Sequence, residues 1–195
     1  QAREIRAEGI EFYGLDASKK TILVTGGSLG AGTLNKAVMR CLKDIGQWQE
    51  VQVLWQCGSY YYEDLKKQLD GKLPENVKLL AFLKRMDLAY AAADIVVARA
   101  GAGTISELCL LEKAAVLIPS PNVAEDHQTK NAMALVDKGA AVMIRDTEAE
   151  ERLEQVLTGL LSDEKQRKEL EKHIAELAIR DSDEQIAREI LKVIG

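Results

Sequence analysis

A glycine-rich segment near the start of the chain has the composition of an anion-binding loop. The segment TGGSLGAG at 25–32 contains Gly27, Ser28 and Gly30 and follows the apolar run TILVT. Glycines before a helix let backbone N–H groups approach an anion, and a helix N-terminus favours negative charge. The spacing matches neither the G-x-G-x-x-G fingerprint nor the P-loop, because Leu29 separates the glycines and no Lys-Ser/Thr pair follows. Taken alone, the segment is equally typical of a plain tight turn.

A second segment repeats this arrangement. After the run DIVVA at 94–98, Gly101, Ala102, Gly103 and Thr104 lead into an expected helix that begins with TISEL. Small residues would again expose backbone amides, and the Thr104 hydroxyl could cap the helix or bind a phosphate oxygen.

Two charged residues accompany this second segment. Glu107 lies three residues after Thr104, so both are expected on one face of the first helical turn. Its carboxylate could accept hydrogen bonds from vicinal ribose hydroxyls, or it could simply complement the helix dipole. Arg99 could contact an anion or be the buried partner of an acid.

A third segment, PSPNVAEDHQTKNA at 119–132, carries several polar side chains. His127, Gln128 and Asn131 fall within about one turn of an expected helix and offer hydrogen bonds suited to a sugar. A histidine at this position is as often structural or solvated.

A fourth segment, AFLKRMD at 81–87, is mainly apolar. Phe82, Leu83 and Met86 could flank a flat base, although core packing is the ordinary role of such side chains.

The elements that would position these segments alternate along the chain. Most expected strands are apolar on both faces, which is typical of a parallel sheet covered by helices on each side. We therefore predict an α/β fold, a Rossmann-like doubly wound sheet of six parallel strands. The expected strands are 21–25, 51–56, 77–82, 94–98, 114–119 and 140–144, and the helices lie near 30–45, 60–70, 86–92, 103–111 and 127–138.

The segment 147–195 is predicted to be helical. Thr147–Glu150 and Ser182–Gln185 both match a capping box, and Ile186, Ile190 and Ile194 form a stripe at helical spacing. The whole chain, 1–195, is expected to be a single domain.

Composition narrows the possible partners and location. The net charge of −5 and pI near 5.3 argue against nonspecific nucleic-acid binding, which requires a basic face. The three cysteines form no CxxC pair, so neither a disulfide framework nor a zinc site is expected. No stretch approaches the roughly 18 apolar residues of a spanning helix, and the first residues do not look like a secretory signal. We expect a cytoplasmic location.

Together the four segments resemble the donor-binding half of the MurG family of glycosyltransferases. The similar motifs are GGSLGAGTLN, FLKRM, ADIVVARAGAGTISEL and PSPNVAEDHQTKNA, and they occur in family order between Thr21 and Ile144. The family adds N-acetylglucosamine to the lipid-linked muramoyl-pentapeptide of peptidoglycan synthesis. The resemblance implies one half of a GT-B fold, with UDP-N-acetylglucosamine as the donor.

The resemblance also implies a role for each matching residue. The donor diphosphate would be approached by residues of the two glycine loops, namely Gly27, Ser28, Gly30, Ala102, Gly103 and Thr104. The uracil would be held by Phe82, Leu83 and Met86. Glu107 would bind the ribose, and His127 and Gln128 would lie at the sugar. No metal or other cofactor is implied, because helix dipoles and amides would stabilise the departing UDP. Catalytic residues are not expected here, since the acceptor site and general base belong to a separate N-terminal domain with no counterpart in this chain. The full-length protein would lie peripherally on the inner face of the cell membrane.

Alternative functions remain open from the sequence. A stand-alone nucleotide-binding module without catalysis would need the same glycine loops. A UDP-sugar epimerase shares the architecture, although its catalytic acids are not apparent. A nicotinamide-dependent dehydrogenase is the least favoured, because the glycine spacing is wrong for it.

Overall fold

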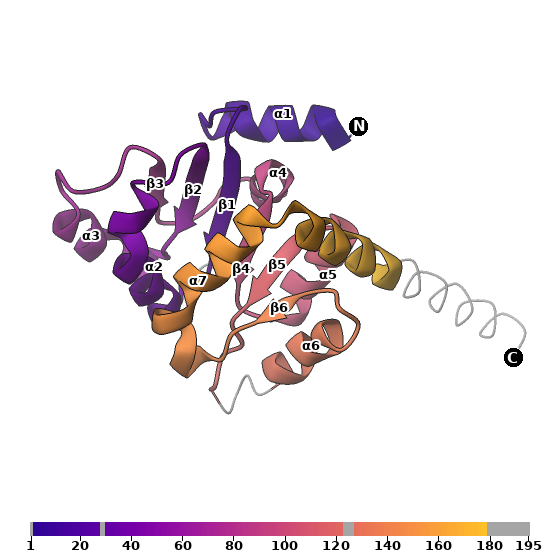
Figure 1. Ribbon diagram of the computed structural model, residues 1–195. Helices are drawn as coiled ribbons and strands as arrows, with labels where there is room; N and C mark the ends of the chain where they lie inside the picture. The colour runs from indigo at the N-terminus through magenta and orange to yellow at the C-terminus, as the bar shows by residue number, and fades with distance from the viewer. Residues whose placement is uncertain (1, 28–29, 123–126, 179–195) are drawn as a thin grey trace, which may run out of the picture.

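Six parallel strands form one sheet, as the alternation of apolar runs predicts. The computed structural model describes residues 2–27, 30–122 and 127–178 (Figure 1). The strand order is β3-β2-β1-β4-β5-β6, the order of a Rossmann-type sheet. The strands are β1 (Lys20–Thr25), β2 (Val51–Gln56), β3 (Val77–Leu80), β4 (Ile95–Ala98), β5 (Ala114–Leu117) and β6 (Val142–Met143).

Helices cover both faces of this sheet. They are α1 (Ala2–Phe12), α2 (Gly32–Ile45), α3 (Ser59–Gln68), α4 (Met86–Ala92), α5 (Ala102–Leu110), α6 (His127–Val136) and α7 (Ala149–Ser162), and residues 164–178 are also helical. The five helices expected between strands are confirmed, whereas α1 was not indicated by the sequence pattern.

Two hydrophobic cores lie on the two faces of the sheet. Successive residues of one strand alternate between them: in β1, Ile22 and Val24 join the core beneath α2, α3 and α7, whereas Leu23 joins the core beneath α4, α5 and α6. All three side chains are at most 2% exposed. Burial on both faces explains why these strands are continuous apolar runs rather than alternating ones.

The strand order reverses direction between β1 and β4. These two strands pair directly, with Thr25 opposite Ala98 at their carboxyl ends. The connections that follow them therefore leave the same edge of the sheet and diverge to opposite faces. Such a switch point leaves a crevice beyond the strand ends, where ligands of open α/β sheets bind.

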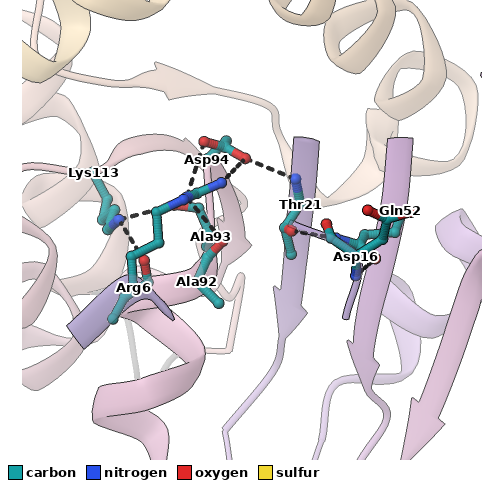
Figure 2. Close-up of polar contacts among 9 residues, drawn as sticks. Arg6, Asp16, Thr21, Gln52, Ala92, Ala93, Asp94 and Lys113 are labelled. Atoms are coloured by element: carbon teal, nitrogen blue, oxygen red, sulfur yellow. Dashed lines mark hydrogen bonds and ion pairs between the residues drawn. The ribbon is translucent and has the colours of Figure 1, made fainter. Parts of the chain in front are cut away.

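The first helix is attached to the opposite edge of the sheet by polar contacts (Figure 2). The Arg6 guanidinium donates to the Asp94 carboxylate and to the carbonyl oxygen of Ala92, both at 3.2 Å. The same carboxylate accepts a 2.8 Å hydrogen bond from the backbone N–H of Thr21. Because Ala92 is the last residue of α4, these contacts join α1 to α4 and to β1.

The predicted capping box at Thr147 is wrong. A 3₁₀ turn at Asp146–Glu148 precedes α7, Glu148 occupies the N-cap position, and no side chain caps the helix. The turn is fixed instead by Asp146, whose carboxylate is paired with Arg99 and accepts a hydrogen bond from the Thr33 hydroxyl. The second predicted box and the isoleucine stripe lie outside the described residues.

Candidate functional site

A cavity of about 520 Å³ opens at the carboxyl ends of β1 and β4. Eight of the residues predicted to form a site line it, and they come from four separate segments of the chain. These eight are Gly27, Gly30, Met86, Arg99, Gly103, Thr104, Glu107 and Gln128. The switch point thus brings together residues far apart in sequence.

The first glycine loop turns sharply between β1 and α2. Gly27 and Gly30 both have positive φ, +89° and +84°, and the N–H of Gly30 donates to the carbonyl oxygen of Gly27 at 3.0 Å. A β-carbon on Gly30 would lie only 2.1 Å from the carbonyl oxygen of Cys57. Glycine is therefore required at position 30 by both conformation and space. Ser28, which the sequence places in this loop, lies outside the described residues.

Two polar side chains missed by the sequence reasoning hold this loop. The Gln56 amide donates to the carbonyl oxygen of Gly27 at 2.6 Å and accepts a hydrogen bond from the Thr25 hydroxyl. Both side chains are at most 5% exposed. Their signal in the sequence is a polar residue at the end of a largely apolar strand.

The second glycine loop starts α5 at Ala102, one to two residues earlier than expected. Gly101 is the N-cap and no side chain caps the helix, so Thr104 is not the cap. The first N–H groups of a helix have no intrahelical acceptor, which leaves those of Ala102, Gly103 and Thr104 for another partner. A β-carbon on Gly101 or Gly103 would meet nothing within 4 Å, so the residues around this helix start leave open space. Ala102 itself is exposed and is not among the residues that line the cavity.

The early start moves Glu107 into the second turn of α5. The first turn contains no acidic residue, so the alternative in which Glu107 complements the helix dipole from that turn is wrong. Glu107 instead lines the cavity together with Tyr90 of α4, which is 2% exposed. Burial raises the pKa of Tyr90, and the negative charge of the nearby Glu107 raises it further.

Tyr90 is a further residue that sequence reasoning missed. It lies in the segment LAYAAAD, which resembles an ordinary buried helix, and no local pattern sets it apart. Its position becomes informative only when α4 and α5 are packed together.

Arg99 is the buried partner of an acid, one of its two predicted roles. Its guanidinium lies 2.5 Å from the Asp146 carboxylate, with both side chains less than 20% exposed. It also donates to the carbonyl oxygens of Ile118 and Pro119 at 3.1 and 3.2 Å. Arg99 thereby joins the end of β4 to the end of β5 and to the turn before α7, while still lining the cavity.

Gln128 anchors the start of α6 to the same edge. Its side-chain oxygen accepts hydrogen bonds from the N–H groups of Ala100 and Ser120, at 3.2 and 2.9 Å. Among the described residues the structure assigns no partner to its amide nitrogen, and Gln128 lines the cavity. His127, the first residue of α6, is exposed and does not line it.

A second, smaller cavity adjoins the first. It has a volume of about 350 Å³, and Phe82, Leu83 and Met86 lie in its wall. Thr25, Gly27 and Met86 line both cavities, so the two are neighbours. Phe82 is 53% exposed, which is unusual for a core side chain, whereas Leu83 and Met86 pack partly on the core beneath α4.

The described part of the chain holds neither a metal-binding cluster nor a membrane-spanning helix. Residues 2–27, 30–122 and 127–178 contain no group of three or more histidine, cysteine, aspartate or glutamate side chains placed to hold a metal ion. Within the same ranges, none of the helices combines the length and apolar character needed to cross a bilayer.

The order of the strands and the crevice at the switch point define a Rossmann-like domain of the kind found in one half of a GT-B glycosyltransferase. The chain belongs to the glycosyltransferase family 28 C-terminal domain, whose family model matches residues 21–186.

Full-length relatives are about twice as long as this chain. It is 50% identical over 194 residues to the UDP-N-acetylglucosamine–N-acetylmuramyl-(pentapeptide) pyrophosphoryl-undecaprenol N-acetylglucosamine transferase of Parabacteroides distasonis, covering 100% of this chain and 52% of that protein. The enzyme of the same name from Bacteroides thetaiotaomicron is 48% identical over 190 residues, covering 96% and 51%. The chain thus spans about half the length of the curated relatives it matches.

Solved structures agree with this assignment. The crystal structure of Acinetobacter baumannii MurG superimposes with a TM-score of 0.70 at 32% identity, covering 88% of this chain and 48% of that one. The C-terminal CMP-Kdo binding domain of WaaA from the same species matches with a TM-score of 0.67, covering 90% and 96%, and at 12% identity it shows the fold alone.

Proposed function

We propose that the chain, 1–195, is the donor-binding domain of an inverting glycosyltransferase that transfers N-acetylglucosamine from UDP to the lipid-linked muramoyl-pentapeptide, converting lipid I to lipid II. The observation that carries the proposal is that two glycine-rich helix starts, those of α2 and α5, line one cavity at the switch point. The relatives named above are transferases of this kind, and the chain covers about half of each.

The diphosphate would lie between the two helix starts. There the amides around Gly27 and Gly30, together with those of Ala102, Gly103 and Thr104, would donate to its oxygens. Since the helix dipoles also favour negative charge, they would stabilise UDP as the bond to the sugar breaks. This arrangement would need no metal ion.

The nucleoside would extend from the diphosphate toward the smaller cavity. Phe82, Leu83 and Met86 would contact the uracil ring, which suits the partly exposed Phe82 side chain and the shared position of Met86. Glu107 would accept hydrogen bonds from the ribose hydroxyls, because a carboxylate is a strong acceptor for two adjacent O–H groups.

The sugar would lie near the start of α6. The unassigned amide nitrogen of Gln128 would donate to the N-acetylglucosamine hydroxyls, and His127 would lie at the rim. Arg99 would act mainly by fixing the strand ends, since its guanidinium is already occupied by Asp146.

Acceptor binding and catalysis would require the rest of a full-length protein. The acceptor site and the general base are proposed to lie in a preceding domain, as the 51–52% coverage of the relatives suggests. Because the relatives' name specifies an undecaprenol-linked acceptor, such an enzyme would work at the inner face of the cell membrane, as a peripheral protein.

Calorimetric titration of the chain with UDP-N-acetylglucosamine, UDP and NAD tests the donor site. We expect both uridine ligands to bind and NAD not to compete. Glu107→Gln should lower the affinity for UDP by about 1.5–3 kcal/mol, as for a hydrogen bond to a charged group. Glu151→Gln, an exposed glutamate of α7, is the matched control and should leave the affinity unchanged. Failure to bind either uridine ligand, or a preference for NAD, would refute the proposal.

A further inference from the structure

One carboxylate connects the starts of the two helices that border the cavity. Asp146 lies in the turn between β6 and α7, and its Oδ1 accepts a hydrogen bond from the Arg99 guanidinium at 2.5 Å. Its other oxygen, Oδ2, accepts a hydrogen bond from the Thr33 hydroxyl at 3.2 Å. Thr33 is the second residue of α2, and Arg99 precedes Gly101, the N-cap of α5, by two residues. The three side chains therefore form a bridge between the two glycine-rich helix starts.

This bridge lies behind the wall of the cavity. Of its three members, Arg99 alone is among the described residues that line the cavity. The Arg99 and Asp146 side chains are 17% and 16% exposed, and Thr33 is half-buried. The hydrogen bonds of Arg99 to the carbonyl oxygens at the end of β5 hold its guanidinium in place, so Asp146 is anchored at a defined position. Asp146 and Thr33 can therefore influence a bound ligand only by placing the groups in front of them.

We propose that Thr33 and Asp146 are positioning residues: the bridge fixes the separation of the starts of α2 and α5 and thereby sets the preference of the site for a nucleoside diphosphate over a monophosphate. A diphosphate between the two helix starts uses the N–H groups of both, whereas a single phosphate depends less on their separation. Groups held beforehand in the bound arrangement do not have to be ordered on binding, which corresponds to roughly 3- to 10-fold in affinity. The inference rests on the proposed function, because it assumes that the diphosphate lies between these two helix starts.

The experiment compares UDP with UMP by calorimetry, in the wild-type chain and in Thr33→Val. This substitution keeps the shape of the side chain and removes the hydroxyl. We expect Thr33→Val to weaken UDP binding roughly 3- to 10-fold and UMP binding less than about 2-fold, so that the preference for the diphosphate shrinks. Thr33→Ser keeps a hydroxyl and should restore the wild-type preference.

A matched control is available on the exposed surface of α7. The Thr158 hydroxyl donates to the carbonyl oxygen of Gln155 at 3.0 Å, within the same helix. Thr158→Val therefore makes the same chemical change away from the bridge, and it should leave the affinities for UDP and UMP unchanged.

A double variant tests whether the effect passes through Asp146. In an Asp146→Ala background the Thr33 hydroxyl has already lost its acceptor, so Thr33→Val should change the affinity for UDP no further. An equal effect of Thr33→Val in both backgrounds would contradict the bridge. Thermal unfolding of each variant shows whether it is folded at the titration temperature. If Asp146→Ala is unfolded there, the comparison of Thr33→Val with Thr33→Ser decides alone.

The outcomes separate the inference from the proposed function. If the wild-type chain prefers UDP to UMP and Thr33→Val keeps the same preference, the positioning role is refuted and the donor site stands. An equal loss of both ligands in Thr33→Val would show a merely structural role and refute it as well. If the wild-type chain fails to bind UDP, the proposed function fails and the inference with it.

Discussion

The glycine loops provide a graded test of how the backbone shapes the site. Gly103→Ala would add a β-carbon that meets nothing within 4 Å, in a helix where alanine is favoured, so stability should be unchanged or rise by up to about 1 kcal/mol. Gly27→Ala would also meet open space, but at a φ of +89°, which costs roughly 1–2 kcal/mol. Gly30→Ala would combine similar strain with a 2.1 Å approach to the Cys57 carbonyl oxygen. Overpacking adds about 1–3 kcal/mol to the cost of the strain, so Gly30→Ala should lower the free energy of unfolding by about 2–5 kcal/mol in total.

Urea unfolding, followed by tryptophan fluorescence, measures these differences directly. Trp55 is fully buried beside the first loop and donates a hydrogen bond to Asn35, whose amide in turn binds the Cys57 carbonyl oxygen. For a chain of this size each kcal/mol corresponds to about 2–4 °C in melting temperature, so the order can be checked by heating. A Gly30→Ala variant no less stable than Gly27→Ala, or a Gly103→Ala variant destabilised as much as either, would contradict this order.

Three further predictions concern side chains that are buried or largely buried. Arg99→Met should lower the free energy of unfolding, measured by urea titration, by about 2–4 kcal/mol because it leaves the largely buried Asp146 without its partner. Adding Asp146→Asn should recover part of that loss. An unchanged stability of Arg99→Met would contradict this prediction. Burial raises the pKa of Cys41 to about 12, above the ordinary thiol value of 9.0, so the unfolded chain ionises first and stability should fall as pH rises from 9 towards 12. The Cys41→Ala variant should lose less stability than the wild-type chain over that pH interval. An identical pH dependence of stability in the two chains would show that the Cys41 thiol does not contribute to it. Gln56→Leu removes the donor that holds the Gly27 carbonyl oxygen and should weaken UDP binding several-fold in calorimetry, whereas full affinity would show that the loop needs no such support.

The sheet could be predicted because its signal is local. Apolar runs such as IVVA at 95–98 are buried on both faces, and a run of that kind is diagnostic without knowledge of its neighbours. Gly27 and Gly30 could likewise be recognised as glycines of a tight loop; both have positive φ, and Gly30 is also closely packed.

The residues that were missed or mispredicted depend on contacts between distant segments. Helix α1 is fixed by the contact of Arg6 with Asp94, which is 88 residues away, and its own sequence gave no comparable signal. Thr147 had the spacing of a helix cap, but the ion pair of Asp146 with Arg99 set a different turn. Tyr90 could not be distinguished from core tyrosines until α4 and α5 were packed together.

One measurement tests the central claim most directly: amide chemical-shift mapping of the isotopically labelled chain during titration with UDP-N-acetylglucosamine. If the donor lies between the two helix starts, the amides of Gly27, Gly30, Gly103 and Thr104 should shift together and saturate at one ligand concentration. Helix α7, on the other face of the sheet from α5, should remain unperturbed. Shifts confined to one glycine loop, to residues away from both, or absent altogether would contradict the account.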